Sequence, residues 1–316
     1  LALACLGIKK GDEVIMPTFT MIATAYAVLY LGAKPVFVDS EDRTWNMDVS
    51  MVEEKINKNT RALLPVHIYG HPVDLDPLIK LSRKYGLFVV EDAAEAHGAE
   101  YIDRICGSMG DINCFSFYAN KVITTGEGGM VVTDNKKLAE KARLLKDLSH
   151  SSKQRFLHTS LAYNYRMTNM QAAIGLAQTE NVNKLIEKKR SIAKIYHDNL
   201  KTIEGLRLPL EEKWAKSVHW MYSILVEKNF GLTRDQFRSE LLKEGIETRS
   251  FFIPMHRQPV IQKMGLVDRK KKYPVSDYIS EHGLYLPTGL ALKDKDVMFV
   301  CEKIRKIQKR HASRAR

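Results

Sequence analysis

The 316-residue sequence has few cysteines and no long apolar run, and these absences exclude several classes of protein. Its four cysteines lie far apart and form no C-x-x-C pair, so they indicate neither a zinc site nor a disulfide framework. No apolar stretch approaches the roughly 20 residues of a membrane-spanning helix, and no signal peptide is visible. We therefore expect a protein of the reducing cytoplasm without a membrane span. The cysteines are Cys5, Cys106, Cys114 and Cys301.

Length, composition and charge indicate a protein with a substantial core. A chain of this length with 45% hydrophobic residues can bury one large or two moderate domains. The formal net charge is +12, and Lys or Arg occupies seven of the fourteen positions from 303 to 316. Clustered positive charge can bind nucleic acid or anionic lipid. Because no aromatic residues are interleaved, we interpret this segment as the solvated end of a last helix and expect no nucleic-acid partner.

The most informative stretch runs from residue 112 to 130 and reads I-N-C-F-S-F-Y-A-N-K-V-I-T-T-G-E-G-G-M. It begins as an alternating apolar run, typical of a mostly buried strand, and ends in glycines before a second apolar run. Lys121 lies between the two runs. The amine of a lysine among apolar and aromatic neighbours can act as a nucleophile and form a Schiff base with an aldehyde. The alternative is an ordinary lysine at a strand end, whose ammonium reaches water.

Two carboxylates follow an apolar run upstream of this stretch. Residues 87–90 predict a short buried parallel strand, and Asp92 and Glu95 come directly after it. Ligands of open α/β sheets bind at the carboxyl ends of strands. A carboxylate there can pair with a protonated ring nitrogen and hold the ring as an electron sink. From the residues alone, Asp92 fits a helix N-cap equally well.

Strand-like and helix-like segments alternate from residue 11 onward. This alternation predicts an α/β fold, a mostly parallel sheet with helices on both faces. A long helical pattern from about residue 170 to 200 then leads to a smaller α+β domain. The predicted strands are Glu13–Met16, Pro35–Val38, Ala62–Ile68, Leu87–Val90, Asn113–Phe117, Gly129–Thr133 and His219–Val226. The predicted helices are Ile22–Leu31, Leu75–Tyr85, Lys136–Leu145, Thr233–Lys243 and a last helix from Asp294.

Four segments in this order resemble the DegT/DnrJ/EryC1/StrS family of sugar-nucleotide aminotransferases. They read G-D-E-V-I-M-P-T-F-T at 11–20, E-D-A-A-E-A-H-G at 91–98, F-S-F-Y-A-N-K-V-I-T-T-G-E-G-G-M at 115–130 and Y-N-Y-R-M-T-N-M-Q-A-A-I-G at 163–175. The resemblance implies the aspartate aminotransferase fold of pyridoxal phosphate enzymes, known as fold type I. We place its large cofactor-binding domain at residues 1–190 and its small domain at residues 191–316.

Two further phrases are similar to one branch of this family. V-H-I-Y-G-H-P at 66–72 and E-T-R-S-F-F-I-P-M-H at 247–256 look closest to the perosamine synthase branch, which aminates carbon 4 of a keto-deoxy sugar nucleotide. Lys121 favours transamination, because the dehydratases of the same family carry histidine at this position. The resemblance also implies L-glutamate as the amino donor.

The resemblance assigns roles to Lys121 and to residues near it. It implies that Lys121 binds the aldehyde of pyridoxal phosphate as a Schiff base and that Asp92 keeps the ring nitrogen protonated. Glu95 matches a position, often glutamine, that hydrogen-bonds the ring hydroxyl. Thr20 lies where a hydroxyl contacts the cofactor, and Met21 lies where other members pack an aromatic residue on the ring. From the residues alone, Thr20 belongs equally to an ordinary turn.

Five more residues complete the predicted site, and no metal ligand is expected among them. Ser116 resembles the phosphate-binding serine of the family, and Asn164 resembles an asparagine that reaches the cofactor phosphate of the neighbouring subunit. Arg166, Arg249 and His256 are expected to bind the substrate, and the resemblance places the loop of the latter two over the sugar. Taken alone, Arg166 fits a structural salt bridge, and His256 fits packing beside an apolar loop.

The resemblance predicts a cytoplasmic homodimer with shared active sites that makes O-antigen, lipopolysaccharide or other surface polysaccharide precursors. The chain starts within a helix-like L-A-L-A-C-L-G segment, whereas a phosphate-binding turn precedes this helix in the family, so we interpret the chain as truncated. Three alternatives stay open. They are an aminotransferase for a 3-keto sugar nucleotide, a non-catalytic or regulatory relative, and another fold-type-I pyridoxal enzyme.

Overall fold

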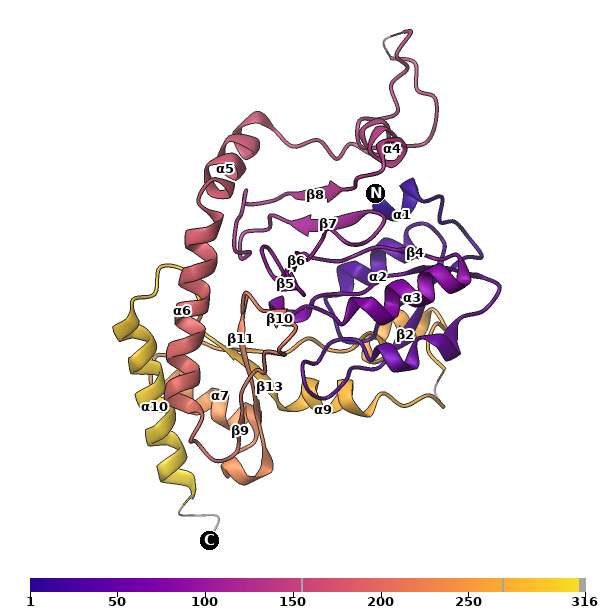
Figure 1. The fold of residues 1–316 in the computed structure, drawn as a ribbon. Helices are drawn as coiled ribbons and strands as arrows, with labels where there is room; N and C mark the ends of the chain where they lie inside the picture. Colours follow the sequence, from indigo (N-terminus) through magenta and orange to yellow (C-terminus); the bar gives the residue numbers. More distant parts are fainter. Residues whose placement is uncertain (155, 269, 313–316) are drawn as a thin grey trace.

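The N-terminal part is built on a parallel sheet in the computed structural model, which describes residues 1–154, 156–268 and 270–312 (Figure 1). Its strand order is β2-β1-β3-β4. Single parallel bridges join Val66 to Asp92 and Asp92 to Cys114, which extends the sheet toward β7. The predicted mostly parallel α/β fold is therefore confirmed. The strands are β1 (Glu13–Pro17), β2 (Lys34–Val38), β3 (Thr60–Leu63) and β4 (Phe88–Val89).

Helices cover both faces of this sheet, and the strand residues alternate between two cores. Val14 and Met16 belong to one apolar cluster, and Ile15 between them belongs to the other. All five residues of β1 are buried, as expected for a central strand. The helices of this part are α1 (Ala2–Cys5), α2 (Ile22–Leu29), α3 (Leu75–Tyr85) and α4 (Lys136–Lys146).

The strands β7 (Asn113–Ser116) and β8 (Gly129–Val132) form a separate antiparallel pair, and the predicted strands around them are confirmed. Ser116 pairs with Gly129 at the end of this ladder. The chain between the two strands carries Lys121. The carboxyl end of β7 therefore leads into the loop that carries Lys121.

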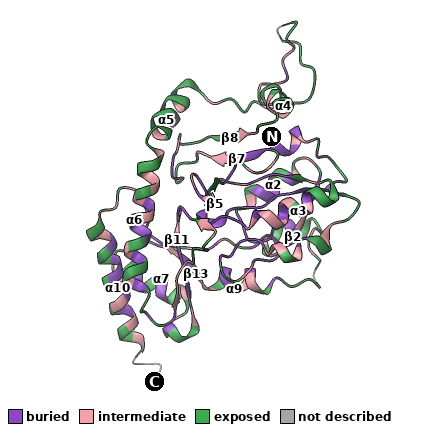
Figure 2. Ribbon diagram, viewed as in Figure 1, coloured by how far each residue is buried: buried purple, intermediate pink, exposed green. Residues whose placement is uncertain are grey.

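The long helical pattern predicted after residue 170 is two helices, α5 (Asn169–Thr179) and α6 (Val182–Leu200). Thr168 caps α5, because its side chain accepts a hydrogen bond from the backbone of Gln171, whose side chain accepts one from the backbone of Thr168. None of the residues of α5 is buried. α6 buries one face and leads into the C-terminal part (Figure 2).

The C-terminal part contains an antiparallel sheet in the order β12-β13-β11-β9. The helices α6, α7 and α10 pack on it and form a third apolar core. Its helices are α7 (Arg234–Lys243), α8 (Pro259–Lys263), α9 (Pro274–His282) and α10 (Asp294–Ala312). Its strands are β9 (Leu206–Arg207), β11 (Tyr222–Val226), β12 (Arg249–Ser250) and β13 (Gly283–Leu286).

The boundary between residues 190 and 191 stays a prediction, which this third core supports. Trp220 and Phe251 nevertheless belong to a core of the N-terminal part, and Met255 belongs to the other. The two parts of the chain thus share apolar packing around the loops that face the lysine.

Two predicted strands are shorter in the structure. The strand predicted for Ala62–Ile68 ends at Leu63, because Pro65 lacks an N–H for the ladder, only a single bridge at Val66 continues it, and a 3-10 turn begins at Ile68. The strand predicted for His219–Val226 begins at Tyr222, since His219 has φ 46°. A small sheet of β5 (Glu100–Tyr101), β6 (Arg104–Ile105) and β10 (Ala215–Lys216) was not predicted.

Several basic residues of the C-terminal segment are paired with acids. Lys303 lies 2.6 Å from Glu244 on α7, and Lys306 contacts Glu302 one turn earlier on α10. These ion pairs fit the interpretation as a solvated helix face. Residues 313–316 lie outside the described residues. Across the described part of the chain, none of the helices combines the length and apolar character that crossing a membrane requires.

A buried ion pair fixes the segment that leads to Asp92. His67 Nε2 lies 3.0 Å from Glu91 Oε2, and both side chains are fully buried. Glu91 also accepts hydrogen bonds from the backbone N–H groups of Gly107, Met109 and Gly110, at 2.6 to 2.7 Å. These bonds tie the loop of residues 107–110 beneath the carboxyl end of β4.

We predict that His67→Ala lowers the free energy of unfolding by about 3 kcal/mol, because it leaves the buried Glu91 carboxylate without the N–H donor of the imidazole, whose other nitrogen accepts from the backbone of Val73. Urea denaturation measures this loss. Lys84→Ala is the matched control, since Lys84 forms an exposed ion pair with Glu53 and its removal should leave stability nearly unchanged. Equal losses in the two variants would contradict the prediction.

Candidate active site

Lys121 lies in the loop after β7, with only 11% of its side chain exposed. Its Nζ atom lies 3.8 Å from Glu95 Oε1 and 3.9 Å from the centroid of the Trp220 ring. Its backbone N–H donates to the carbonyl of Tyr118, which closes a turn. The lysine is therefore held inside the protein, and the alternative of an ammonium that reaches water does not describe it.

Asp92 follows β4 and accepts one hydrogen bond on each carboxylate oxygen. Thr24 Oγ1 donates to Oδ2 at 2.7 Å, and the backbone N–H of Ala94 donates to Oδ1 at 3.1 Å. Asp92 thus caps a turn, and no helix begins there in the described structure. Thr20 Oγ1 lies 3.5 Å from the hydroxyl of Thr24. The carboxyl ends of β1 and β4 therefore bring together two hydroxyls and a carboxylate.

Glu95 is a buried acid beside the lysine, with 4% of its surface exposed. Burial raises the pKa of its carboxyl to about 7, although the positive charge of Lys121 acts in the opposite direction. The backbone N–H of Tyr69 donates to its Oε2 at 2.7 Å. Near neutral pH, this carboxyl can hold or release a proton within reach of the amine.

His97 is part of the packing beneath this cluster. Its ring lies 5.4 Å from the ring of Phe115 and 5.9 Å from that of Phe117. Burial and the nearby charge of Lys121 lower its pKa to about 4, and a backbone contact with Ser116 offsets this only in part. The imidazole is therefore neutral near pH 7 and acts as an apolar support.

The remaining cofactor-binding candidates lie at the same edge of the sheet. Ser116 ends β7, and its Oγ accepts a hydrogen bond from the backbone N–H of Tyr118 at 3.2 Å. Met21 caps the start of α2 and is half exposed. Thr20 is buried. Ser116 ends β7, and Thr20 lies in the loop between β1 and α2, so their contacts with a cofactor stay a prediction.

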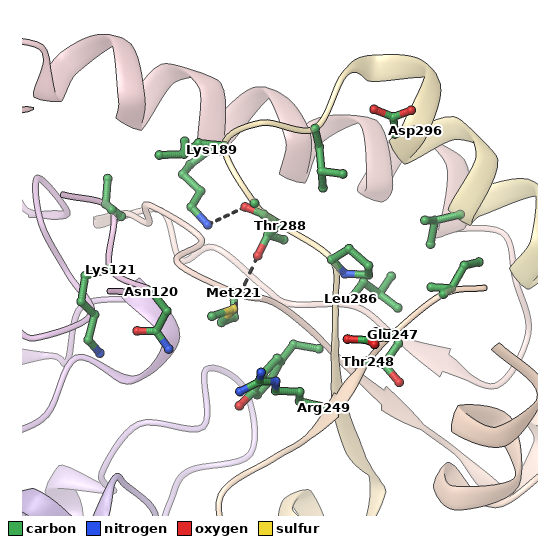
Figure 3. A pocket seen from close by; sticks show the side chains of 18 of the residues that line it. Asn120, Lys121, Lys189, Met221, Glu247, Thr248, Arg249, Leu286, Thr288 and Asp296 are labelled. Carbon is green, nitrogen blue, oxygen red and sulfur yellow. Dashed lines mark hydrogen bonds between the residues drawn. The ribbon is translucent and has the colours of Figure 1, made fainter. Parts of the chain in front are cut away.

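A cavity of about 830 Å³ adjoins Lys121 and separates it from the C-terminal sheet. Figure 3 shows Lys121 and Asn120 on one side and Arg249, Thr248 and Glu247 on the other. Arg249 belongs to β12, so the structure brings this predicted substrate residue to the same cavity as the lysine. A guanidinium there can bind an anionic group of a substrate.

The structure places His256 outside this cavity. Its Nδ1 lies 2.8 Å from Thr18 Oγ1, and its Nε2 lies 3.0 Å from Asp277 Oδ1. These contacts connect α9 to the residue after β1. The prediction that His256 binds substrate has no support from this geometry, which instead gives the side chain a structural role.

Asn164 and Arg166 lie near the carboxyl end of α4, since Asn164 forms a bridge with Asp147. Arg166 lines a second cavity, of about 800 Å³, together with residues of β8 and α4. Its Nε donates to Asn164 Oδ1 at 2.9 Å, and its Nη1 lies 3.1 Å from Asp147 Oδ1. The salt bridge considered from the sequence is therefore present, and neither residue reaches Lys121 of its own chain.

The helix after these residues is apolar and exposed. The exposed fractions on α5 are 78% for Met170, 50% for Ile174 and 62% for Leu176. Apolar side chains gathered on one exposed element commonly mark a protein interface.

The fold and this lysine site define the class of protein. The chain belongs to the DegT/DnrJ/EryC1/StrS aminotransferase family, which it matches over residues 1–305. It is 42% identical over 304 residues to the GDP-perosamine synthase of Escherichia coli O157:H7, with 96% of this chain and 81% of that protein covered.

Two further similarities extend this finding. A UDP-N-acetyl-3-dehydro-alpha-D-glucosamine 3-aminotransferase of Acidithiobacillus ferrooxidans is 39% identical over 308 residues, which cover 97% of this chain and 80% of that protein. The crystal structure of DesV from S. venezuelae superposes with a TM-score of 0.91 at 35% identity, covering 98% of this chain and 81% of that chain.

Sequence reasoning missed Trp220 and Lys189, which lie close to the lysine in the fold. Trp220 follows Lys121 by about one hundred positions and belongs to no motif that carries chemistry. The sequence gives a signal for Lys189 alone, because this lysine lies on the otherwise apolar face that α6 buries.

We predict that the free energy of unfolding of Glu95→Gln increases relative to that of the wild type as the pH rises. The folded pKa of about 7 exceeds the ordinary value of 4.5, so the native protein keeps a proton that the unfolded chain has released. Wild-type stability therefore falls as pH rises between these values, by about 3 kcal/mol, and glutamine does not titrate.

Urea denaturation at about pH 4.5 and about pH 8 measures the difference between the two proteins. Glu204→Gln, at an exposed position, is the control and should give a constant difference. A difference for Glu95→Gln that does not change with pH would contradict the prediction.

Proposed function

We infer that this chain is a pyridoxal phosphate-dependent aminotransferase that moves an amino group from L-glutamate to a 4-keto-6-deoxy sugar nucleotide. The observation that carries this inference is the buried amine of Lys121, set beside Glu95 at the carboxyl ends of the strands. Family membership and the identity to a GDP-perosamine synthase support it.

The residues present fit the cofactor. Each oxygen of Asp92 accepts a single hydrogen bond in the described structure, which leaves lone pairs for the N–H of a protonated ring. Lys121 supplies an amine for the aldehyde, and the hydroxyls of Ser116 and Thr20 are available for polar groups of the cofactor. When bound, pyridoxal phosphate supplies an electron sink for the reacting carbon.

In this proposal, each side chain of the site has a separate role in holding or moving protons. Asp92 keeps a proton on the ring nitrogen by its negative charge. Lys121 would move a proton at Nζ as a general acid and base. Glu95 holds or shares a proton close to this amine, because its pKa of about 7 allows both states. Arg249 binds an anionic group of the substrate across the cavity.

The acceptor sugar is aminated at carbon 4 in this proposal. The relative from E. coli is named a GDP-perosamine synthase, and the phrases around His67 and Arg249 resemble the same branch, which implies carbon 4. The relative from A. ferrooxidans is named a 3-aminotransferase and is nearly as similar, so a 3-keto acceptor is the second candidate. Few contacts distinguish two positions of one ring.

We further propose a cytoplasmic homodimer whose active sites are shared, and a product that enters surface polysaccharide synthesis. The exposed apolar side chains of α5 support a second copy of the chain as partner. Asn164 is exposed in the segment that leads to α5, and this proposal assigns it to the surface that meets the partner. The four cysteines are unpaired, which suits a reducing compartment.

Replacing Lys121 by Ala should abolish the first half of the reaction, because no other amine is placed beside Glu95 in the described structure. We expect wild-type protein with pyridoxal phosphate to give a protein-bound absorbance band that L-glutamate bleaches. Lys121→Ala should lack this band and transfer amino groups at least roughly a thousandfold more slowly. The control Lys58→Ala, at an exposed position, should behave as wild type. A normal band in Lys121→Ala would contradict the proposed function.

The choice of acceptor is tested with a 4-keto-6-deoxy and a 3-keto sugar nucleotide that carry the same nucleotide. We expect kcat/KM to be at least roughly tenfold higher for the 4-keto compound, because a pocket shaped for one ring position misplaces the other carbonyl. Release of 2-oxoglutarate in single turnovers reports the donor reaction separately. A preference for the 3-keto compound would favour the second candidate.

A further inference from the structure

Trp220 forms an aromatic wall of the lysine site. The residue is 3% exposed, and its ring centroid lies 3.9 Å from Lys121 Nζ. The carboxylate of Glu95 lies at a similar distance, 3.8 Å, from the same nitrogen. The amine therefore has an aromatic face and a carboxylate as its two nearest partners, and both stabilise the ammonium form.

The indole is tied to the loop that carries the lysine. Trp220 Nε1 donates to the carbonyl of Asn120 at 2.8 Å, one residue before Lys121. This hydrogen bond fixes the indole ring relative to the backbone of the loop that carries Lys121.

A buried lysine holds the other end of the same residue. Lys189 on α6 donates to the carbonyl of Thr288 (Figure 3) and to that of Trp220, both at 2.7 Å. It is 5% exposed. Burial lowers its pKa to about 8. The described residues provide no carboxylate to pair with it, so its charge is satisfied by these carbonyls. An unpaired buried cation is costly, and its effect here is to fix the backbone of Trp220.

Close backbone packing sets the distance between Trp220 and Glu95. Gly70 has φ 93°, and a Cβ atom there would lie 3.0 Å from both Trp220 N and Glu95 O. His219, directly before Trp220, takes the left-handed φ of 46°. Such backbone strain in a non-glycine residue persists where the surroundings impose it.

We propose that the ring of Trp220 stabilises the ammonium of Lys121 whenever this side chain is not bonded to the cofactor, and that Asn120 and Lys189 position the ring for this. The proposal rests on the proposed function for the identity of the reactive amine. An amine held in this way stays beside Glu95 after the amino donor has displaced it, ready to return its proton to the reacting carbon.

The test measures how fast Lys121 is acetylated by acetic anhydride in the cofactor-free full chain, as a function of pH, with peptide mass spectrometry. Exposed Lys58 is the internal reference. Trp220→Leu removes the aromatic face, Trp220→Phe keeps a weaker one, and Trp214→Leu controls for loss of a tryptophan that packs on Tyr101 instead. The titratable and charged side chains near Lys121 remain in all variants, namely Asp92, Glu95, His97, Lys189 and Arg249.

We expect the midpoint of the pH profile of Lys121 labelling to fall by roughly 0.4–1.5 pH units in Trp220→Leu, which is roughly a 2- to 30-fold faster reaction at neutral pH. The midpoint should fall by less in Trp220→Phe, and it should be unchanged in Trp214→Leu. A rate that rises equally at every pH would mean that the ring only blocks access, and this would overturn the proposal. An unchanged profile would overturn it as well.

Two features keep the result interpretable. If circular dichroism shows that Trp220→Leu does not fold, Trp220→Phe decides by itself, because its smaller shift is still expected. The labelling needs neither cofactor nor substrate, so failure of the glutamate reaction contradicts the proposed function alone. An active enzyme with an unshifted profile in Trp220→Leu contradicts only the role of Trp220.

Discussion

The central constraint on this structure is the enclosure of one lysine amine at the edge of a parallel sheet. An ammonium leaves water only if other groups replace its hydration, and here an acid and an aromatic ring do so within 4 Å of Lys121 Nζ. Neither group belongs to the loop of the lysine. The parallel strands must therefore end together, and the C-terminal part must fold back onto them, before the amine has its surroundings.

Adjacent residues after β4 show how the sheet meets this constraint. Glu91 turns away from the site and ties the loop of residues 107–110, whereas Asp92 turns toward it and takes hydrogen bonds from Thr24 and Ala94. This alternation follows from extended backbone, whose successive side chains point to opposite faces. The carboxylate of Glu91 thus holds the surrounding loop in place, and that of Asp92 faces the site.

The sequence was sufficient to predict the elements and residues that depend on neighbouring positions in the chain. The strand patterns predicted the sheet, and the position of Asp92 and Glu95 after one strand predicted their place at its carboxyl edge, since this rule depends on direction alone. Trp220 and Lys189 could not be found in this way, because their contacts with the lysine loop join segments far apart in the chain. His256 differs from expectation for the same reason, since its partners Thr18 and Asp277 come from distant elements.

Gly70 has a consequence for how this site tolerates change. It has no side chain, yet the space at its α-carbon separates the backbone of Glu95 from that of Trp220. A Cβ atom there would lie 2.7 Å from Val218 Cγ2 and 3.0 Å from backbone atoms of both Glu95 and Trp220, and the φ of 93° already disfavours any side chain. One of the least replaceable positions around the lysine is thus one that contributes no chemical group, and variation among relatives should be restricted there as strictly as at the reacting residues.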